Sequence, residues 1–557
     1  MNDVGFQPGP VTRPVGLETE FGVLRPGDAY ANPVVLSSRV VEAYCAGVPT
    51  VRWDYEGEDP LADLRGGRLR RSAAHPSQLT DDPARPAPSG DAPPADAGEM
   101  ADPPPAPWGS RARPSAAEAA LPRATTAVLV NGARFYVDHA HPEYSSPEVL
   151  TPRDALIWDR AGEVVARRAM TALGDEGDGD GTPAEIVLYK NNVDGKGAAY
   201  GSHENYLVRR DVPFEELAAV LVPFLVTRPV LVGAGRVGIG QRSERPGFQI
   251  SQRADYVESE IGLQTTFNRP IINTRDEPHA DNVRWRRLHV INGDANRFDV
   301  PIYLKVATAD LLLWFLEQAY TEGSGRFKEA LARLKDLAII GDPVEEHWAL
   351  SHDPTLSHEL RTQAGAMTAL EVQRAILDAV SPAVTRVEDV QAHRALALWR
   401  QVLDALEQWR HDGTGPAAQM VEWVAKYELC EGLRRRSGTG WDDPRLAALD
   451  IQWADLRPGR SVVDKLDAAD RIHRLVTDAE IQRAADTPPE GTRAAVRGTA
   501  IRRHRQIVGA SWTCLLLDVP GTPALARLRL PDDVVVGPDE TATILEEIGR
   551  RAEPERH

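Results

Sequence analysis

Four segments of the sequence carry ionisable or polar residues at alternate positions. The pairs are Glu18 with Glu20, Tyr136 with Asp138, His203 with Asn205, and Arg287 with His289. In a β-strand, side chains at positions i and i+2 point to the same face, whereas neighbours such as Leu17 and Phe135 point to the other. Glu143 follows Asp138 at the end of its segment. If these segments are strands of one sheet, one face gathers carboxylates, two imidazoles and a guanidinium.

Such a concentration of carboxylates and imidazoles predicts a bound cation. Like charges at this density repel one another or must be desolvated unless a cation neutralises them. Oxygen-rich ligation suits Mg²⁺, which usually accompanies nucleotide phosphates. A single pair of this kind is more often a solvent-exposed strand face, but four pairs that all carry metal- or phosphate-binding groups favour a magnesium–nucleotide site.

Two arginines in polar loops have two open interpretations. Arg253 lies in the segment ISQRADY and Arg275 in the segment IINTRDEPHAD. Each guanidinium either forms a salt bridge, as Arg275 would with Asp276 or Glu277, or clamps a phosphate or a substrate carboxylate.

Residues 233–238 match the pattern G-x-G-x-x-G of dinucleotide-binding proteins. That fingerprint also requires a helix that begins there and an acidic residue about 20 positions further on, within a βαβ unit. Here the chain continues as Ile239-Gly240-Gln241, which indicates a loop. We therefore interpret this segment as a glycine-rich loop rather than a dinucleotide site.

The elements that must position the polar residues are strands in the first half of the chain and helices after them. The pattern predicts strands over residues 15–23, 126–130, 133–138, 184–190, 204–209 and 287–291. Asn131-Gly132 is a strong hairpin-turn signal. Helical periodicity covers residues 214–225, 308–320, 327–337, 369–380 and 393–408. Because neighbouring strands are linked by hairpins rather than helical crossovers, we predict an α+β fold with an antiparallel sheet.

A proline-rich stretch marks an insertion in the first half of the chain. Twelve of the 43 prolines fall between Pro76 and Pro122. A stretch of this composition, residues 73–122, cannot bury enough apolar surface to offset its ordering entropy, so we predict that it is disordered. Residues 52–66, RWDYEGEDPLADLRG, carry aromatic, acidic and turn residues that would order against a surface. We predict a catalytic domain over residues 1–440 with an insertion at 46–125, and a small C-terminal domain over residues 441–557 that ends in a helix near 541–551.

Composition excludes several classes of protein. The chain has 557 residues, a net charge of −18 and a pI of about 5.3, which disfavours a general nucleic-acid binder. Three widely spaced cysteines, Cys45, Cys430 and Cys514, fit a reducing cytoplasm rather than a disulfide scaffold. The N-terminal residues lack the features of a signal peptide, and the best apolar run, residues 217–226, is too short to span a bilayer. We expect a cytoplasmic protein that binds neither nucleic acid nor membrane.

The segments described above resemble the Pup ligase/depupylase family, which belongs with glutamine synthetase to the carboxylate–amine ligase superfamily. The resemblance covers nearly the whole chain outside the proline-rich stretch. It rests on the motifs GLETEFG, LVNGARFYVDHAHPEYSSPE, YKNNVDGKGAAYGSHENYL, SQRADY, IINTRDEPHAD and RRLHVINGDAN. It implies a glutamine-synthetase-like fold, in which a curved antiparallel sheet is backed by helices and followed by a small C-terminal domain.

Several segments are similar to the depupylase branch of this family rather than to the ligases. They are DHAHPEYSSPE, NNVDGKGAAYGSHENY and GRVGIG, together with residues 52–66, which resemble a loop specific to that branch. GLETEFG, in contrast, is closer to the ligase form of the first motif.

The resemblance implies a role for each residue of the polar face. Magnesium ions would lie at Glu18, Tyr136, Glu143, His203 and His289. ATP, or ADP with phosphate, would contact Gly16, Leu17, Glu18, Thr19, Glu20, Asn205 and Arg287. Arg253 and Arg275 would hold phosphate near the scissile bond. Asp138 would be the catalytic aspartate, either as the nucleophile or as the base that activates a water molecule.

The implied activity is amide hydrolysis that needs ATP and Mg²⁺, with ATP as a cofactor rather than a fuel. The substrates would be the C-terminal glutamine side chain of Pup and the isopeptide bond between Pup and the lysines of pupylated proteins. The alternative within the family is a Pup–protein ligase that forms the same bond and consumes ATP. A catalytically silent Pup- or nucleotide-binding adaptor is disfavoured by the intact metal and aspartate positions. A ligase for small carboxylates is disfavoured by the Pup-type motifs.

Overall fold

The structure, a computed structural model, describes residues 11–28, 30–75, 78, 106–114, 125–176, 185–194, 197–238, 246–321 and 327–552. Most of the stretch predicted to be disordered, residues 73–122, lies outside these ranges, as does the predicted loop Ile239-Gly240-Gln241.

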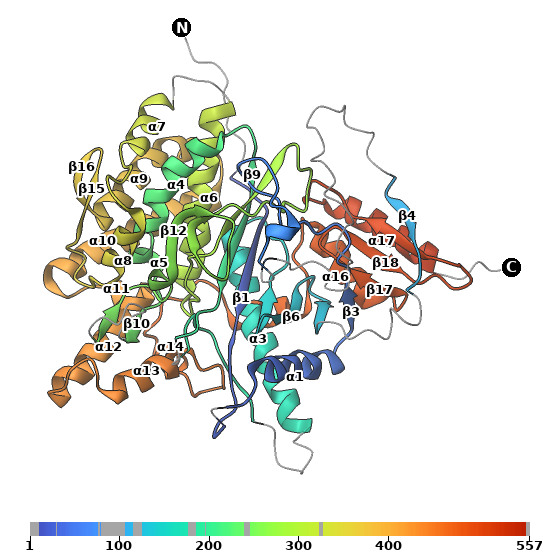
Figure 1. Cartoon of the computed structure of the whole chain (residues 1–557), viewed down its shortest axis with the longest axis horizontal. Helices are drawn as coiled ribbons and strands as arrows, with labels where there is room; N and C mark the ends of the chain where they lie inside the picture. The colour runs from blue at the N-terminus through green and yellow to red at the C-terminus, as the bar shows by residue number, and fades with distance from the viewer. Residues whose placement is uncertain are drawn as a thin grey trace, which may run out of the picture.

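A sheet of thirteen strands runs through the molecule (Figure 1). Its strands, in spatial order, are β12 (Val257–Gly262), β13 (Arg269–Asn273), β14 (Trp285–Val290), β9 (Ser202–Arg209), β1 (Val15–Glu20), β7 (His141–Ser145), β6 (Arg134–Asp138), β5 (Thr126–Leu129), β3 (Thr50–Trp53), β17 (Ile507–Ala510), β18 (Cys514–Leu517), β19 (Leu525–Arg529) and β4 (Trp108–Arg111). Three two-stranded sheets pair β2 (Gly22–Leu24) with β8 (Val187–Tyr189), β10 (Arg236–Gly238) with β11 (Gly247–Gln249), and β15 (Glu359–Thr362) with β16 (Gly365–Thr368).

The strands of the large sheet are mainly antiparallel, which confirms the predicted α+β fold. Two pairs are parallel, β12 with β13 and β3 with β17. The predicted hairpin at Asn131-Gly132 joins β5 to β6, and Gly132 has a φ of 82°, a left-handed conformation that glycine adopts without steric cost. The second half of the glycine-rich segment forms strand β10 rather than the start of a helix, so this segment lacks the geometry of a dinucleotide fingerprint.

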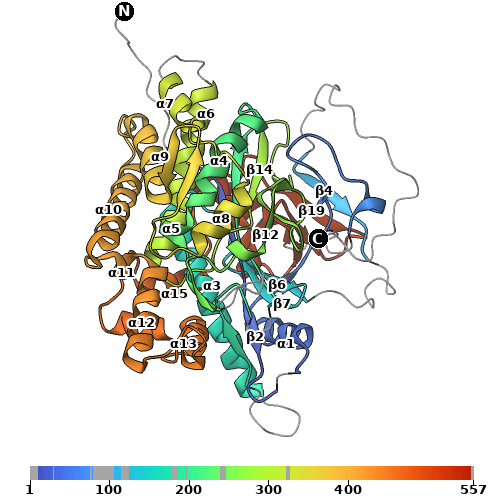
Figure 2. The ribbon, with the colours of Figure 1, turned by 60° about the vertical axis from the view of Figure 1, so that its left-hand side comes forward.

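Helices gather on one side of the sheet and bury its main core (Figures 1 and 2). They include the predicted helices, whose bounds are α4 (Phe214–Thr227), α6 (Asp299–Thr321), α7 (Lys328–Lys335), α9 (Ala369–Val384) and α10 (Val390–Asp412), and also α5 (Pro229–Val232), α8 (Pro343–Ser351), α11 (Ala417–Met420) and α12 (Glu422–Ser437). None of the helices in the described residues is long and apolar enough to cross a membrane.

The long helix α3 (Pro152–Glu176) was not predicted from the sequence, although it joins two parts of the core. Its residues Leu156 and Val164 belong to the main apolar cluster, whereas Val165 and Leu173 pack in a second cluster with α1 (Pro33–Ala46). Helix α3 is therefore buried on more than one face and connects the main core with α1.

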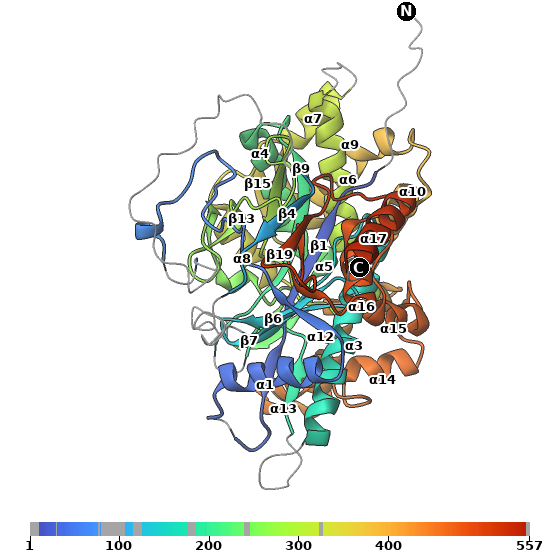
Figure 3. The same cartoon turned by 90° about the vertical axis from the view of Figure 1, so that its right-hand side faces the viewer.

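The C-terminal part of the chain contributes to two regions. Helices α13 (Pro444–Ala454), α14 (Val462–Ala468) and α15 (Asp478–Asp486) lie with the helical side of the molecule (Figures 1 and 2). Helix α16 (Arg493–Arg503), strands β17 to β19 and helix α17 (Pro538–Ala552) form a separate apolar cluster, which also contains Trp53 and Val128 (Figure 3). Helix α17 covers the helix predicted near 541–551, and the domain boundary at residue 440 stays a prediction.

The insertion at 46–125 supplies two strands to the large sheet. Strand β3 pairs with β5 on one side and with β17 on the other, and β4 pairs with β19. For Trp108–Arg111 the expectation of disorder is therefore wrong, because backbone pairing with an edge strand orders a segment with little apolar surface. The Trp108 ring also lies 4.1 Å below the Arg551 guanidinium of α17.

Candidate active site

The register of five adjacent strands brings the predicted site residues together. In β1 and β9, Glu18 lies opposite His203 and Gly16 lies opposite Asn205. Asn205 is in turn opposite His289 of β14. On the other side of β1, Glu20 lies opposite Glu143 of β7, and Glu143 lies opposite Tyr136 of β6. Paired residues share a face of a sheet, so the four alternating pairs of the sequence do form one continuous polar face.

Glu18, His203 and His289 form the first of two groups with metal-binding geometry. The Nδ1 atom of His203 lies 3.1 Å from Oε2 of Glu18, and Nε2 of His289 lies 3.8 Å from the same oxygen. Both ring nitrogens of His289 are buried and have no hydrogen-bond partner among the described residues. A buried imidazole without a partner is costly, and a metal ion bound at one of its nitrogens would remove that cost.

Glu20, Asp138 and Glu143 form the second group. Tyr136 donates a hydrogen bond of 2.5 Å to Oε1 of Glu143, and Ser145 donates one of 3.1 Å to the same oxygen. The sequence analysis assigned Glu20 to the nucleotide, but its carboxylate lies with the two other acids. We missed this grouping because it depends on the pairing of β1 with β7, which the sequence does not reveal.

The electrostatics of the two groups differ. Burial opposes ionisation of Glu18, but the hydrogen bond with His203 and the charge of Arg287 hold its pKa well below the usual range. Burial, followed by the charges of Asp138, Glu18 and Glu20, raises the pKa of Glu143 well above the usual range. Burial lowers the pKa of His289 to about 3, so the imidazole is neutral and can act as a ligand.

These groups fit divalent cations bound by oxygen and imidazole. In the second group of three carboxylates, Glu20 lies 3.1 Å from Nδ1 of His141 and Asp138 lies 3.0 Å from Nδ1 of His139. The first group holds a neutral imidazole whose two nitrogens have no hydrogen-bond partner among the described residues. Gly201 keeps the two groups close, because a Cβ atom there would lie 2.3 Å from Nε2 of His203 and 2.7 Å from Oε1 of Glu20. The Gly201 amide instead donates to Glu20 over 2.9 Å.

Asp138, the predicted catalytic residue, ends strand β6 at the edge of the second group. Its Oδ2 atom lies 3.0 Å from Nδ1 of His139, and its side chain is 27% exposed. His139 has a φ of 49° in the two-residue turn between β6 and β7. The turn therefore presents the Asp138 carboxylate to solvent beside the buried acids, where an incoming substrate can reach it.

A pocket opens beside Glu18 on the other side of the first group. It is lined by the predicted nucleotide-contact residues Gly16, Leu17, Glu18, Asn205 and Arg287, and by Glu148, His279, Arg493, Trp512 and Val534, among others. The last three belong to the C-terminal part of the chain, which the sequence analysis did not connect with the site. Arg493 is held there by Glu148, whose Oε1 atom lies 2.8 Å from its Nε atom.

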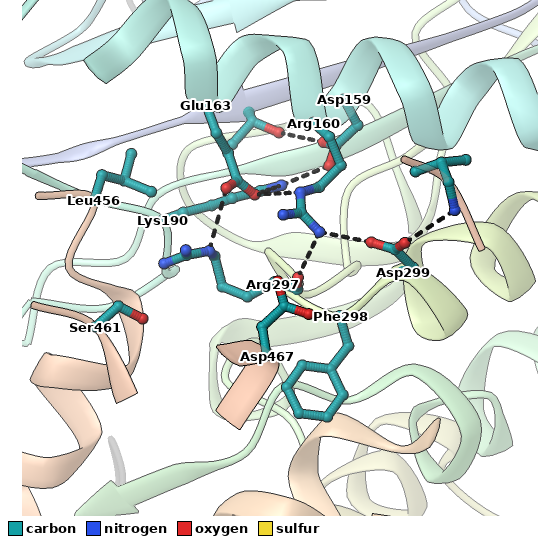
Figure 4. Close-up of polar contacts among 12 residues, drawn as sticks. Asp159, Arg160, Glu163, Lys190, Arg297, Phe298, Asp299, Leu456, Ser461 and Asp467 are labelled. Atoms are coloured by element: carbon teal, nitrogen blue, oxygen red, sulfur yellow. Dashed lines mark hydrogen bonds and ion pairs between the residues drawn. The ribbon is translucent and has the colours of Figure 1, made fainter. Parts of the chain in front are cut away.

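Thr19 is placed differently from its predicted role. Its hydroxyl points away from the pocket and donates to Oδ1 of Asp159 on α3 over 3.3 Å. Asp159 belongs to a buried ionic network on the far side of β1 (Figure 4). Within that network, Nζ of Lys190 lies 2.5 Å from Asp159 and 3.1 Å from Glu163. The Thr19 side chain thus anchors β1 to α3, and only its backbone remains available to a nucleotide.

The network behind β1 also fixes the C-terminal helices to the catalytic sheet. Arg160 of α3 forms an ion pair of 2.6 Å with Asp299 at the start of α6. Asp299 accepts hydrogen bonds from the amides of Leu475 and Val476. Breaking one partner of such a buried pair costs about 3–5 kcal/mol. We therefore interpret this network as the rigid support of the polar face.

The two loop arginines have different environments. Arg275 forms a salt bridge of 2.8 Å with Glu277, as one of its two interpretations predicts. Arg253 is buried and donates to the carbonyl oxygens of Tyr200 and Ile291, each over 3.1 Å, and it has no carboxylate partner among the described residues. Burial, followed by the charge of Arg269, lowers its pKa to about 10. Of the two arginines, Arg253 is therefore the one whose positive charge is not neutralised by a carboxylate of the described residues and can attract an anion.

The loop after β3 is ordered against the segment that follows β13, as predicted for residues 52–66. The Leu64 amide donates to the Thr274 carbonyl over 2.7 Å, and the Asp276 amide donates to the Ala62 carbonyl over 2.9 Å. The Asp59 amide donates to the Glu277 carboxylate over 2.6 Å. Since Glu277 also lies 3.7 Å from Arg287 of the polar face, this loop contacts the edge of that face.

Comparison with known proteins agrees with this geometry. A family model described as Pup-ligase protein matches residues 13–516. The Pup deamidase/depupylase of Mycolicibacterium smegmatis is 42% identical over 93% of this chain and 95% of that protein. A Pup–protein ligase of a Nocardioides species is 38% identical, but over 69% of this chain and 82% of that protein.

Two solved structures are similar to this chain, one over nearly its whole length and the other over about three quarters of it. The complex between the prokaryotic ubiquitin-like protein Pup and its ligase PafA superimposes with a TM-score of 0.72 and 27% identity, and covers 98% of this chain and 94% of the ligase. The structure of PafA in complex with ADP superimposes with a TM-score of 0.67 and 32% identity, and covers 78% of this chain and 91% of that one.

Proposed function

The chain belongs to the Pup-ligase protein family, and from this premise we propose that it is an amidohydrolase that acts on Pup. It removes the side-chain amide of the C-terminal glutamine of Pup and cleaves the isopeptide bond between Pup and a protein lysine. The observation that carries the proposal is the extent of the similarity. The deamidase/depupylase matches 93% of the chain at 42% identity, whereas the ligase matches 69% at 38%.

We propose that Mg²⁺ and ATP, or ADP with phosphate, are the cofactors. Glu18, His203 and His289 would hold one ion, and Glu143 with Glu20 would hold a second, while Tyr136 positions Glu143 through its hydroxyl. The pocket beside Glu18 would hold the nucleotide, with Asn205 and Arg287 at its wall. When bound, these groups supply positive charge that favours ionised carboxylates and stabilises a developing oxyanion. The binding of ADP by the related ligase supports the nucleotide site.

Asp138 is the proposed catalytic residue. Amide hydrolysis needs a nucleophile, a stabilised oxyanion and a protonated leaving amine. The Asp138 carboxylate is accessible at the rim of the second group, where it attacks the substrate carbonyl or takes a proton from a water molecule. His139, 3.0 Å from Asp138, orients the carboxylate. Arg253, whose charge has no carboxylate partner, and Arg275, whose charge is shared with Glu277, would attract phosphate near the scissile bond.

The experiment that tests the proposal uses the purified full-length chain, Mg²⁺, ATP and two substrates. One is Pup that ends in glutamine and the other is a Pup–lysine conjugate. We expect mass spectrometry to detect conversion of the glutamine to glutamate and release of Pup from the conjugate. Formation of conjugates from Pup that ends in glutamate, without deamidation, would contradict the proposal and identify a ligase. The enzyme would work in the cytoplasm, where its three cysteines remain free.

A further inference from the structure

Arg269 is a cationic residue beside the polar face that no role described above uses. It begins β13, and strand alternation puts it on the same face as Asn273, which lies opposite His289 of β14. On the other side of β13, Val257 of β12 lies opposite Arg269. The chain reaches Val257 directly from Arg253 through a single helical turn, Ala254–Tyr256. Two arginines, one at the start of β13 and one in the loop before β12, therefore lie at this edge of the sheet.

Neither of these arginines has a carboxylate partner among the described residues. Arg269 donates from Nε to the carbonyl oxygen of Thr265 over 3.0 Å, and its two terminal nitrogens have no protein hydrogen-bond acceptor in the described structure. Arg269 is half-buried, and this burial lowers the pKa of its guanidinium. Partly buried guanidiniums are normally paired, so two unpaired ones side by side indicate a site for an anion.

The spacing between Arg253 and Glu20 of the second acidic group leaves room for a substrate residue that carries the amide at one end and an anion at the other. Arg253 donates a hydrogen bond of 3.1 Å to the carbonyl oxygen of Tyr200. The amide of the same peptide unit, that of Gly201, donates one of 2.9 Å to Oε1 of Glu20. Across this one peptide unit, Arg253 and Glu20 are on the order of 8 Å apart. In a glutamine residue, four bonds separate the side-chain amide carbon from the α-carboxylate carbon, which places them about 5 Å apart.

We propose that Arg269 binds the free α-carboxylate of the substrate's C-terminal residue, in a positive field that Arg253 strengthens. This inference rests on the proposed function, because both proposed substrates end in a residue whose side chain is amidated and whose α-carboxylate is free. One receptor then serves deamidation and isopeptide cleavage alike. It also excludes internal glutamines, whose α-carboxyl groups are in peptide bonds.

The test compares two Pup substrates that differ only at the C-terminal α-carboxyl group. One ends in glutamine with a free α-carboxylate and the other in glutamine α-carboxamide. The enzymes are the wild type, Arg269→Gln, Arg269→Lys and the control Arg209→Gln. Arg209 is an exposed residue of β9 that pairs with Asp211. Binding of both peptides is measured by calorimetry in the presence of nucleotide and Mg²⁺, and kcat and KM are measured for both.

We expect the wild type and the control to prefer the free carboxylate by about ten- to a hundredfold in affinity and in KM, the range of a charged hydrogen bond. Arg269→Gln should abolish this preference, because it weakens binding of the peptide with the free carboxylate and leaves binding of the carboxamide peptide unchanged. Arg269→Lys should restore part of the preference. A loss of equal size for both peptides would overturn the proposal.

Inorganic phosphate is the other anion that two arginines can bind. If Arg269 holds phosphate instead, Arg269→Gln changes the dependence of activity on added phosphate and leaves the preference between peptides intact, which also overturns the proposal. The binding measurement also separates failure of this proposal from failure of the proposed function. A chain that binds Pup without hydrolysing it would still bind the free-carboxylate peptide more tightly than the carboxamide peptide. A thermal melt of each variant confirms that the fold is retained.

Discussion

Glu143 is a buried acid in a place where an ionised acid is unstable without a cation. Three carboxylates and one phenol surround the same small volume, and burial together with the neighbouring charges raises the pKa of Glu143. The hydroxyl of Tyr136 and that of Ser145 donate to the same oxygen. Repulsion among these carboxylates is therefore unfavourable, and a bound divalent ion would replace it by attraction between each carboxylate and the ion.

The substitution Glu143→Gln tests this arrangement. It keeps the shape and one oxygen but removes the charge, so we expect the Mg²⁺ concentration needed for nucleotide binding to rise by about tenfold or more. Titration calorimetry of nucleotide at several Mg²⁺ concentrations measures the change, with Arg209→Gln as the control. Unchanged nucleotide affinity at every Mg²⁺ concentration would show that Glu143 is not a ligand.

Asp138→Asn separates chemistry from binding. Asparagine is neither a nucleophile nor a base at this position, so we expect the rate of amide hydrolysis to fall by at least about a thousandfold. Because Asp138 lies at the rim and outside the nucleotide pocket, the affinity for nucleotide should change by less than about threefold. Single-turnover rates and calorimetry measure the two quantities. A variant that still hydrolyses Pup at the wild-type rate would remove Asp138 from the mechanism.

The residue types of the site are readable from the sequence, but their grouping is not. Alternation put Glu18, His203 and His289 on one face, and the structure confirms that they meet. Glu20 joins Asp138 and Glu143 only because β1 pairs with β7, and the Thr19 hydroxyl turns to Asp159 only because α3 lies behind β1. Local sequence patterns specify faces of strands, whereas these contacts depend on which elements become neighbours.

At the scale of elements, strand β3 and the loop that follows it connect the C-terminal strands to the polar face. The guanidinium of Arg134 lies between two aromatic rings, 4.1 Å from the Trp53 ring and 3.9 Å from the Tyr136 ring. Trp53 donates a hydrogen bond of 2.5 Å to Glu58 of the loop. Since Tyr136 binds Glu143, this stack joins the loop to the proposed metal site.

Substitutions in residues 53–58 do not all act in the same way. Substitutions in a loop that lies beside an active site are expected to alter turnover rather than stability. Trp53, however, is 5% exposed and packs in the C-terminal apolar cluster, so its replacement by alanine would cost about 3–5 kcal/mol of stability. Glu58 is the better probe of the loop.

Glu58→Gln carries a prediction about pH. Burial raises the pKa of Glu58 from 4.5 to about 7, so between these values the folded protein holds a proton that the unfolded chain has released. The wild type therefore loses stability as the pH rises through this window. Glutamine does not titrate, so the melting temperature of the variant minus that of the wild type should be larger at about pH 8 than at about pH 5. Thermal melts at both pH values measure this, and an equal difference at both would refute the burial of Glu58.

At the scale of the whole molecule, the sequence predicted the α+β class and five of the helices that back the sheet, namely α4, α6, α7, α9 and α10. It did not predict that the insertion at 46–125 builds strands on both sides of β17, β18 and β19. Strands β3 and β4 are short, and each pairs with a strand more than 400 positions away in the sequence. Such pairing is long-range, so a reading of local pattern and composition cannot reveal it.

Two deletions test which part of the insertion belongs to the fold. Replacing residues 79–105, a proline-rich and hydrophilic stretch, with a shorter glycine–serine linker should leave the melting temperature within about 2 °C of the wild type. Extending the deletion through Arg111 removes β4 and the contact of Trp108 with Arg551, and should lower the melting temperature by several degrees more. Equal melting temperatures for the two deletions would mean that β4 does not contribute to stability.

The central claim, that the chain hydrolyses amides with ATP as a cofactor, is tested most directly by stoichiometry. Pup that ends in glutamine, Mg²⁺ and a small amount of ATP are mixed with the full-length chain, and ammonia and ADP are measured over time. The account predicts many molecules of ammonia for each molecule of ADP, because the nucleotide positions charge and is not consumed in each turnover. No ammonia, together with one ADP for each conjugate formed from Pup that ends in glutamate, would contradict it.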